Sequence, residues 1–292
     1  MILRMLKMLR MLKMDLLLKI IDVFQYEVET PKMYGAFHIL FLVLIIVGSV
    51  FLTKFILHHD DKTYRTTILV FWLVMVVMEI YREVTFSVSV TYGVVTWDYA
   101  WYQFPFQLCA TPLYIFPLIA FLPEGRVREA CKMYISTFAL FGGLAVMLYP
   151  GDVLCAYLGI NIQSLIHHGL QLIGGIITIA HNRENHKYEN LYKGGIVFIA
   201  LVAVAMVLNV TVHAYHVSEG MTDTFNMFFI SPYFDCTLPV LSSIYPTVPY
   251  PIFLLTYIIG FAVVAFIMFS LTKLIINGKE IFGSLWKKAK AW

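Results

Sequence analysis

Apolar stretches of about 20 residues recur along the whole chain, and no other feature constrains its fold as strongly. A helix rises about 1.5 Å per residue, so each stretch is long enough to cross a hydrocarbon core of about 30 Å. Hydrophobic residues occupy 60% of the 292 positions, whereas soluble domains contain about half. The sequence therefore predicts an all-α, polytopic membrane bundle and excludes a soluble globular fold.

We expect about seven transmembrane helices in one domain. A loop rich in Pro, Ser, Thr and aromatic residues, 218–248, precedes the last helix. The predicted regions are a basic N-terminal tail at 1–33, a transmembrane domain at 34–276 and a basic C-terminal tail at 277–292. The predicted spans are 34–57, 67–90, 104–122, 131–149, 161–180, 194–217 and 249–275.

Lysine and arginine determine the predicted orientation, because short loops rich in these residues stay in the cytoplasm. The segments after the first, third and fifth spans carry them, as does the C-terminal end, and the loops after the second, fourth and sixth spans carry none. We therefore predict a multi-pass plasma-membrane protein with its C-terminus in the cytoplasm and its N-terminus outside. The cations concerned are Lys54, Lys62, Arg65, Arg126, Arg128, Lys132, Arg183, Lys187, Lys193, Lys273, Lys279, Lys287, Lys288 and Lys290.

The N-terminal tail conflicts with this orientation, because it is basic as well. Either the tail is an interfacial helix held by anionic lipid on the outer leaflet, or the number of spans differs from seven by one. We prefer seven spans, since the four cytoplasmic segments together carry more cations. The cations of the tail are Arg4, Lys7, Arg10, Lys13, Lys19 and Lys32.

Polar side chains on four predicted spans lie at one depth, in the outer half of the bilayer. Charged groups in lipid cost several kcal/mol and normally face the bundle interior or a wet cavity. We therefore predict a polar pocket between the helices that opens outward, although an ion-pair network with a purely structural role would use the same residues. They are Glu79, Arg82 and Glu83 in the second span, Gln107 and Cys109 in the third, Gln163, Ser164, His167, His168 and Gln171 in the fifth, and Asn209, His213 and His216 in the sixth.

The helical period indicates how these side chains are grouped. Arg82 can pair with Glu79, three residues before it on one face. Gln163, His167 and Gln171 share a face of the fifth span at i, i+4 and i+8. Pro105 and Pro112 flank the polar residues of the third span, and proline bends or breaks a helix.

A cysteine near a histidine is the minimal arrangement of a nucleophile and its base. Cys109 is the candidate nucleophile, and His167 or His168 is the candidate base. Gln107 or Gln163 could donate hydrogen bonds to an oxyanion, and Glu83 could orient an imidazole.

Three other chemistries need to be considered. The histidines with Glu83 include enough ligands for zinc or a haem axial pair, but nothing in the spacing fixes a ligand count. A retinal protein needs a mid-helix lysine, which the seventh span lacks. Polar residues confined to half of the membrane form a closed pocket rather than a transport path. Cys155 and Cys236 fall in outward loops and could form a disulfide there.

Three segments resemble the YwaF-like family of bacterial integral membrane proteins. They are WYQFPFQLCATPLYIFPLIAF, LYPGDVLCAYLGINIQSLIHHGLQ and TDTFNMFFISPYFDCTLPVL, and the resemblance covers most of residues 35–275. Phe104 departs from the Leu of the family's Leu-Pro element. The family is related to a mammalian transmembrane phospholipid acyltransferase in which a cysteine and a histidine are implicated. The resemblance implies that Cys109 attacks a lipid acyl group with His167 or His168 as base.

The sequence therefore predicts a lipid acyltransferase or acyl hydrolase. We expect membrane lipid as its partner, and no metal, other cofactor or nucleic acid. The alternative is a non-enzymatic binder or transporter of a small polar or amphiphilic ligand.

Overall fold

The computed structural model describes residues 14–289 and is mostly helical, at 74% of residues. Residues 14–24 form the first helical segment. The α-helices that follow are α2 (Ala36–Leu57), α3 (Asp61–Ser87), α4 (Pro112–Phe121), α5 (Arg126–Tyr134), α6 (Leu140–Leu148), α7 (Leu158–His181), α8 (Leu191–Glu219), α9 (Leu241–Ile244) and α10 (Tyr250–Ala289). The short helices are η1 (Trp101–Gln103), η2 (Leu108–Ala110), the π-helix η3 (Ile135–Ala139), η4 (Arg183–Asn185), η5 (Tyr188–Asn190), η6 (Met227–Phe229) and η7 (Tyr245–Thr247).

Each of the seven predicted spans contains helix, and the membrane bundle is confirmed. Within the described residues, five helical segments are long and apolar enough to cross a membrane: Ala36–Leu57, Arg126–Leu148, Leu158–His181, Tyr188–Glu219 and Tyr250–Ile276. The other two predicted spans correspond to α3, which carries the charged triplet, and to the shorter apolar stretch Leu108–Phe121. The count of seven crossings stays a prediction.

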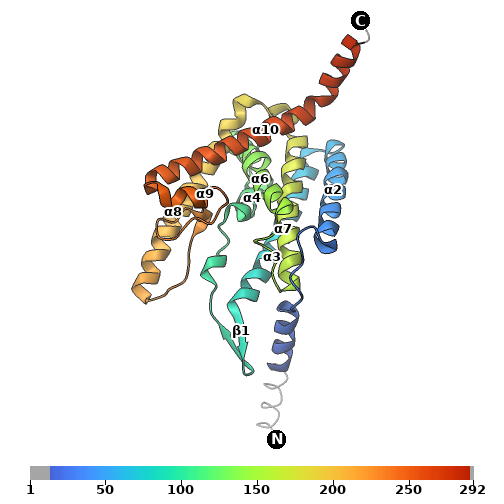
Figure 1. Cartoon of the computed structure of the whole chain (residues 1–292). Helices are drawn as coiled ribbons and strands as arrows, with labels where there is room; N and C mark the ends of the chain where they lie inside the picture. The colour runs from blue at the N-terminus through green and yellow to red at the C-terminus, as the bar shows by residue number, and fades with distance from the viewer. Residues whose placement is uncertain (1–13, 290–292) are drawn as a thin grey trace.

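The two ends of the described chain lie at opposite ends of the bundle (Figure 1). The connections α2–α3, α4–α5 and α7–α8, which carry the basic residues, lie together at the end of the bundle near the C-terminus. There Arg128 of α5 bonds Asp61 at the start of α3, and Asn182 after α7 bonds Glu129. The alternation of loops is therefore as predicted, whereas the side of the membrane that each end faces stays a prediction.

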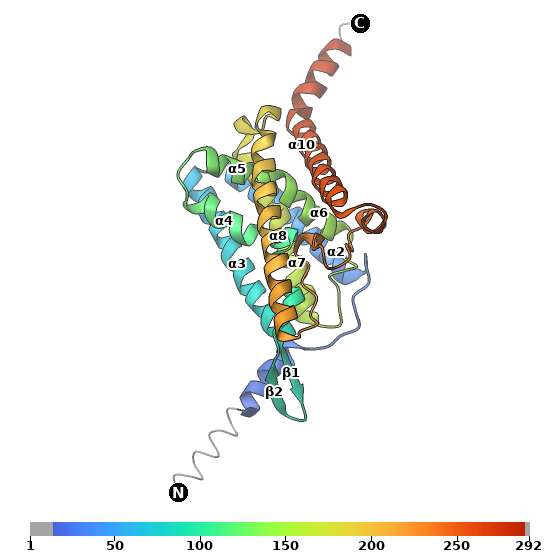
Figure 2. The ribbon, with the colours of Figure 1, turned by 90° about the vertical axis from the view of Figure 1, so that its left-hand side faces the viewer.

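The second predicted span ends earlier than expected, because a hairpin begins at residue 88. Strands β1 (Val88–Thr91) and β2 (Val94–Trp97) pair antiparallel and project from the end of α3 (Figure 2). Alternating β-branched residues favour strands here, and Tyr92 and Gly93 make the turn with φ of 51° and 76°. The helical pattern of the second span therefore stops at Ser87.

The third predicted span is broken rather than continuous. Residues 104–107 are not helical, and η2 and the ten-residue α4 follow. Pro105 and Pro112 bound the break, as their missing N–H groups and fixed φ favour. Since α4 is only about 15 Å long, the predicted crossing at this span would require the non-helical segment to cover the rest of the distance.

The loop between α8 and α10 returns into the bundle. Its residues 225–231 are buried except Phe229, which is partly buried, although the sequence predicted an outward loop at 218–248. Phe228 and Phe229 both have positive φ, 58° and 57°, so the segment turns sharply inside the protein. Non-helical backbone at membrane depth is tolerated when protein rather than lipid surrounds it, and the apolar sequence FNMFFI provides the buried surface.

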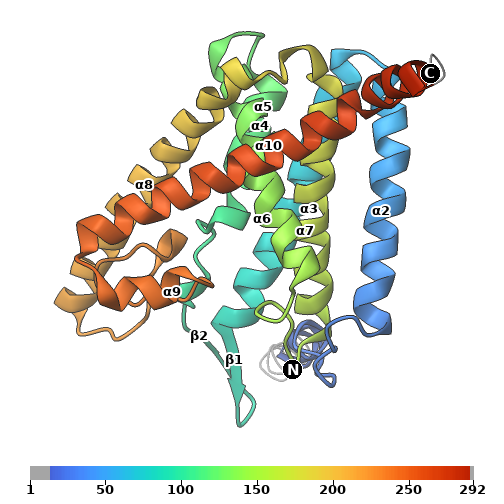
Figure 3. The ribbon, with the colours of Figure 1, turned by 45° about the horizontal axis from the view of Figure 1, so that its top comes forward.

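The first and last helical segments also differ from expectation. Residues 14–24 lead to contacts with α3, where Tyr81 donates to the carbonyl of Phe24 over 2.7 Å. An interfacial role for the tail stays a prediction, and Arg4, Lys7, Arg10 and Lys13 lie outside the described residues. Helix α10 crosses the bundle obliquely (Figure 3) and continues to Ala289, beyond the predicted end of the span at 275.

Candidate functional site

Arg82 on α3 links two acidic residues of its own helix to the backbone that precedes the break in the third span. Its Nη2 donates to Glu79, to Glu83 Oε1 at 3.4 Å and to the backbone carbonyl of Gln103 at 2.6 Å. The predicted pairing of Arg82 with Glu79 is present. The third contact was not predicted, and it satisfies a carbonyl of the segment that precedes the break in the third span.

His167 on α7 contacts Cys109 directly, through the backbone of the cysteine. The imidazole Nε2 lies 3.0 Å from the Cys109 carbonyl oxygen, and Nδ1 lies 4.0 Å from Glu79 Oε2. His167 is 3% exposed. Since a carbonyl only accepts, Nε2 carries the proton in this arrangement. The structure therefore brings Cys109, His167 and Glu79 together from three elements.

His168 lies beside His167, with ring centroids 5.5 Å apart, but faces differently. Its Nδ1 lies 2.7 Å from the carbonyl oxygen of Ser164, one turn earlier on α7. Its Nε2 is buried and has no hydrogen-bond partner within residues 14–289. The imidazole therefore donates from Nδ1 and keeps a lone pair on Nε2.

The two glutamines on α7 have different partners. Gln171 donates from Nε2 to the carbonyl of Ala139 over 2.8 Å, at the end of the π-helix η3. A π-bulge leaves backbone groups misaligned, so this bond compensates for the irregular turn. Gln163 is buried and accepts a bond from the Ser164 hydroxyl at 3.2 Å. The glutamines therefore flank the histidines without contacting Cys109 by a hydrogen bond in the described chain.

Gln107 and Asn209 hold the buried loop. Gln107 donates to the carbonyl of Asn226 over 2.9 Å and accepts from the N–H of Phe228 at 2.8 Å. Asn209 on α8 donates to the carbonyl of Met227 over 3.0 Å and accepts its N–H at 2.7 Å. Each side-chain amide thus donates one hydrogen bond to the loop backbone and accepts another from it. The Gln107 amide is therefore already bonded to the loop and is not free to stabilise an oxyanion in this structure.

The histidines of α8 lie away from the charged cluster. His213 stacks on Tyr233 with ring centroids 3.7 Å apart, and this corrects its predicted position in the pocket. His216 is buried against Trp101, and its Nδ1 is 3.3 Å from the carbonyl of Asp223. Both imidazoles therefore anchor the loop that follows α8, because they lie on the helix faces that this loop covers.

A cavity of about 170 Å³ adjoins Cys109. It is larger than the engineered apolar cavity of about 150 Å³ that binds benzene. Charged and imidazole side chains are absent from its described lining, so the predicted polar pocket is instead a buried polar cluster beside an apolar cavity. The lining residues are Gln107, Leu108, Cys109, Phe141, Gly142, Ala145, Val146, Phe228, Phe229, Leu238, Tyr257 and Phe261.

The sequence did not single out two of these contributors. Tyr257 is a fully buried phenol near the start of α10, and a buried Tyr among aliphatic residues was the available signal. Phe228 reaches the cavity only because its loop folds inward. The apolar run around it was the signal, since an exposed loop seldom contains five apolar residues among six.

The predicted disulfide is absent. Cys155 and Cys236 are both free thiols, as are Cys109 and Cys131. Asn161 on α7 bonds the backbone N–H and carbonyl of Cys155, both at 2.8 Å, and so fixes it at the start of that helix. Cys236 is instead buried in the hydrophobic core with the loop after α8. Across residues 14–289 no group of three His, Cys, Asp or Glu residues is arranged to hold a metal ion.

Comparison with known proteins gives one match. The family model described as the TMEM164 family matches residues 33–273, which leaves out the N-terminal tail and the end of α10. No curated protein and no solved structure matches the chain.

Proposed function

Since the chain belongs to the TMEM164 family of transmembrane proteins, we propose that it is a lipid acyltransferase or acyl hydrolase that uses Cys109 and His167. One observation carries the proposal: His167 contacts Cys109 at 3.0 Å, and that cysteine borders an apolar cavity. The resemblance to the YwaF-like family and to a phospholipid acyltransferase supports the same pair.

The geometry favours His167 over His168 as the base. The thiol and the carbonyl of Cys109 belong to one residue, so the thiol lies within about 5 Å of the oxygen that His167 contacts. Catalytic hydrogen bonds are often imperfect without substrate. In the productive state the imidazole proton of His167 lies on Nδ1 and is donated to Glu79. Nε2 then no longer bonds the carbonyl of Cys109, and its lone pair faces the thiol. Arg82 then keeps Glu79 ionised and in position.

The proposed reaction has two steps. Nε2 of His167 takes the thiol proton, and the thiolate of Cys109 attacks the carbonyl carbon of a lipid ester. The ester C–O bond breaks, a thioester forms, and the leaving lysolipid oxygen takes the proton from the imidazolium. A lysolipid hydroxyl then attacks the thioester and restores the thiol in a transferase, or water does so in a hydrolase.

The apolar cavity supports a lipid substrate. Phe141, Tyr257 and Phe261 offer aromatic and aliphatic surface but no charge, which suits the part of an acyl chain nearest the ester. The cavity holds only a short length of chain. The remainder of the chain therefore has to lie elsewhere, among the neighbouring helices or in the bilayer.

Purified full-length protein in lipid vesicles tests this proposal. We expect Cys109→Ala to abolish acyl turnover, whereas the control Cys155→Ala retains it, because Asn161 holds Cys155 through backbone groups that alanine keeps. His167→Gln can still donate to the carbonyl but cannot carry a proton, so we expect a loss of roughly 10²–10⁴ in rate. Unchanged turnover in Cys109→Ala would remove the nucleophile.

A non-enzymatic binder is the competing function, and the buried cluster gives it one observation. Glu83 Oε2 and His168 Nε2 have no hydrogen-bond partner among residues 14–289, so they could receive a small polar ligand. Under this alternative, Glu83→Gln and His168→Ala abolish ligand binding while Cys109→Ala has a mild effect.

We place the protein in the plasma membrane with its C-terminus in the cytoplasm, which labelling of cysteines introduced into each loop would check.

A further inference from the structure

A second pocket lies between α4, α5 and α8, at the end of the bundle near the C-terminus. Its volume is about 810 Å³, and it shares no lining residue with the cavity at Cys109. Most of its wall is aliphatic. The lining residues are Ile115, Leu118, Arg126, Val127, Ala130, Cys131, Tyr192, Lys193, Ile196, Val197, Ala200, Leu201 and Val204.

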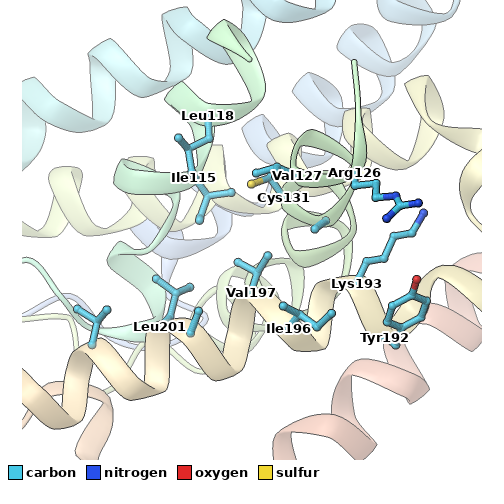
Figure 4. A pocket seen from close by; sticks show the side chains of 13 residues that line it. Ile115, Leu118, Arg126, Val127, Cys131, Tyr192, Lys193, Ile196, Val197 and Leu201 are labelled. Atoms are coloured by element: carbon cyan, nitrogen blue, oxygen red, sulfur yellow. The ribbon is translucent and has the colours of Figure 1, made fainter. Parts of the chain in front are cut away.

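Two cations meet at one end of this pocket. Figure 4 shows Arg126 of α5 and Lys193 of α8 reaching the same end beside Tyr192, while Ile115 and Leu201 line the remainder. Cations so close together repel each other unless an anion lies between them. The cation pair and the apolar wall thus form one amphiphilic surface.

Neither cation is neutralised by another described residue. In the part of the chain that the structure describes, no ion pair includes Arg126 or Lys193. Glu124 pairs with Arg128 and Lys132, Glu129 pairs with Lys132, and Glu189, four residues before Lys193, is not within ion-pair distance of it. The positive charge at this end is therefore available to a ligand.

The local backbone also favours an anion. Arg126 is the first residue of α5, and Lys193 lies in the first turn of α8. No side chain caps the N-terminus of either helix. At α5 the positive end of the helix dipole and its unpaired N–H groups therefore add to the two side-chain charges, whereas the helical segment that contains Lys193 already begins at Tyr188.

The length of the apolar wall suits a lipid chain. From Tyr192 to Val204 the lining follows α8 for about 18 Å, a little more than half of a hydrocarbon core of about 30 Å. Acyl chains occupy one leaflet, so the wall covers the depth of a single chain. An apolar wall alone selects no particular lipid, because lipid tails are as apolar as the side chains. Selection therefore depends on the cations.

We propose that this pocket binds one anionic phospholipid, with its phosphate at Arg126 and Lys193 and one acyl chain along α8. The site is separate from the cavity at Cys109 and does not depend on the proposed acyl transfer. Under the predicted orientation it lies in the cytoplasmic leaflet, where anionic lipids are concentrated.

Native mass spectrometry of the full-length protein in detergent tests the proposal. The probes are palmitoyl-oleoyl phosphatidylglycerol, the matched phosphatidylcholine, and glycerol phosphate as a head group without chains. We expect the anionic lipid to bind more tightly than the zwitterionic lipid. Arg126→Gln with Lys193→Gln should weaken it roughly thirtyfold, since each cation near the surface contributes about 1 kcal/mol and 1.4 kcal/mol is tenfold.

Matched variants separate this site from general charge. Lys62→Gln with Lys187→Gln removes two exposed cations at the same end of the protein, outside the pocket, and should leave binding unchanged. Ala200→Trp fills the apolar wall and should weaken both lipids, while Arg126→Lys with Lys193→Arg should retain the preference. The proposal is overturned if the control pair weakens binding as much as the pocket pair, or if glycerol phosphate binds as tightly as the lipid.

Discussion

Replacing Asn209 by leucine tests how the buried loop is held. The side chain makes two bonds to one residue, to the N–H of Met227 at 2.7 Å and to its carbonyl at 3.0 Å. Leucine has a similar volume but neither donates nor accepts. The substitution therefore leaves the N–H of this fully buried residue without a partner, while its carbonyl keeps the bond from the N–H of Ile230 at 3.3 Å.

The expected magnitude follows from the N–H of Met227. A buried backbone group left unsatisfied costs about 1–3 kcal/mol, so the variant should lose roughly that much. Hydrogen bonds between membrane helices average nearer 0.6 kcal/mol, which places the expectation toward the lower end. Because Phe228 and Phe229 follow Met227 and line the cavity at Cys109, the cavity should loosen as well.

Reversible unfolding of the full-length protein in mixed detergent micelles measures this loss. Thr211→Val is the matched control, since Thr211 lies on the same helix and its hydroxyl donates to a carbonyl of that helix, Val207, over 2.8 Å. We expect a change below about 0.5 kcal/mol for this exposed position. Equal stability of the two variants would refute the assignment of Asn209 as the residue that holds the loop.

Three further substitutions probe the packing and the polar end of the bundle. Arg128→Met should cost about 3 kcal/mol, because the 1% exposed guanidinium bonds Asp61 at 2.7 Å and the carbonyl of Ile119 at 2.8 Å, and a hydrogen bond of a charged group contributes about 1.5–3 kcal/mol; denaturant unfolding measures this, and an unchanged midpoint would contradict it. Burial lowers the pKa of His186, in the loop before α8, from 6.5 to about 4, so the unfolded chain binds the proton more readily than the folded chain. The free energy of unfolding should therefore fall by up to about 1.4 kcal/mol per pH unit as the pH drops from 6.5 to 4. The free energy of unfolding of His186→Gln should depend less on pH in this range, and identical profiles for the variant and the native protein would exclude the effect. Gly143→Leu should destabilise the protein by about 1–3 kcal/mol, since a Cβ at Gly143 would lie 2.9 Å from the backbone nitrogen of Leu172; a melting temperature unchanged from the native protein would show that α6 and α7 can separate.

The sequence determined the helices well because their pattern is local. Each of the seven spans predicted from apolar length contains helix, and Pro105 and Pro112 marked the break in the third span, whereas the short helix α9 inside the predicted loop 218–248 was not expected. The hairpin at 88–97 was missed because the apolar run of the second span continues into it. The sequence predicted that the last span ends at 275, because hydropathy falls there. The helix itself continues to Ala289.

The structure brings three of the selected polar residues together, Glu79, Cys109 and His167, but the contacts that each of them makes were predicted less well. Arg82, His167 and Gln107 were selected as side chains of a pocket, yet each of them also bonds backbone outside the α-helices, in η1, in η2 and in the buried loop, respectively. A sequence shows that a glutamine lies at a given depth, but not that a loop 120 positions later folds inward to meet it. The same difficulty explains His213, which faces Tyr233 of that loop.

Backbone bonding and catalysis are compatible at this site. A carbonyl bond orients His167 in the folded protein, and the 4.0 Å separation from Glu79 leaves Nδ1 able to move. The residues that hold the broken segments therefore also bring a thiol, an imidazole and a carboxylate together beside an apolar cavity.

An acyl adduct on Cys109 tests the central claim most directly. The purified protein is incubated with a phospholipid that carries an isotope-labelled acyl chain, and its peptides are analysed by mass spectrometry with and without hydroxylamine. We expect a labelled acyl group on the peptide of Cys109, removed by hydroxylamine as a thioester is, and absent from His167→Gln. Acyl turnover without any adduct on Cys109, or an adduct that is independent of His167, would contradict the proposed pair.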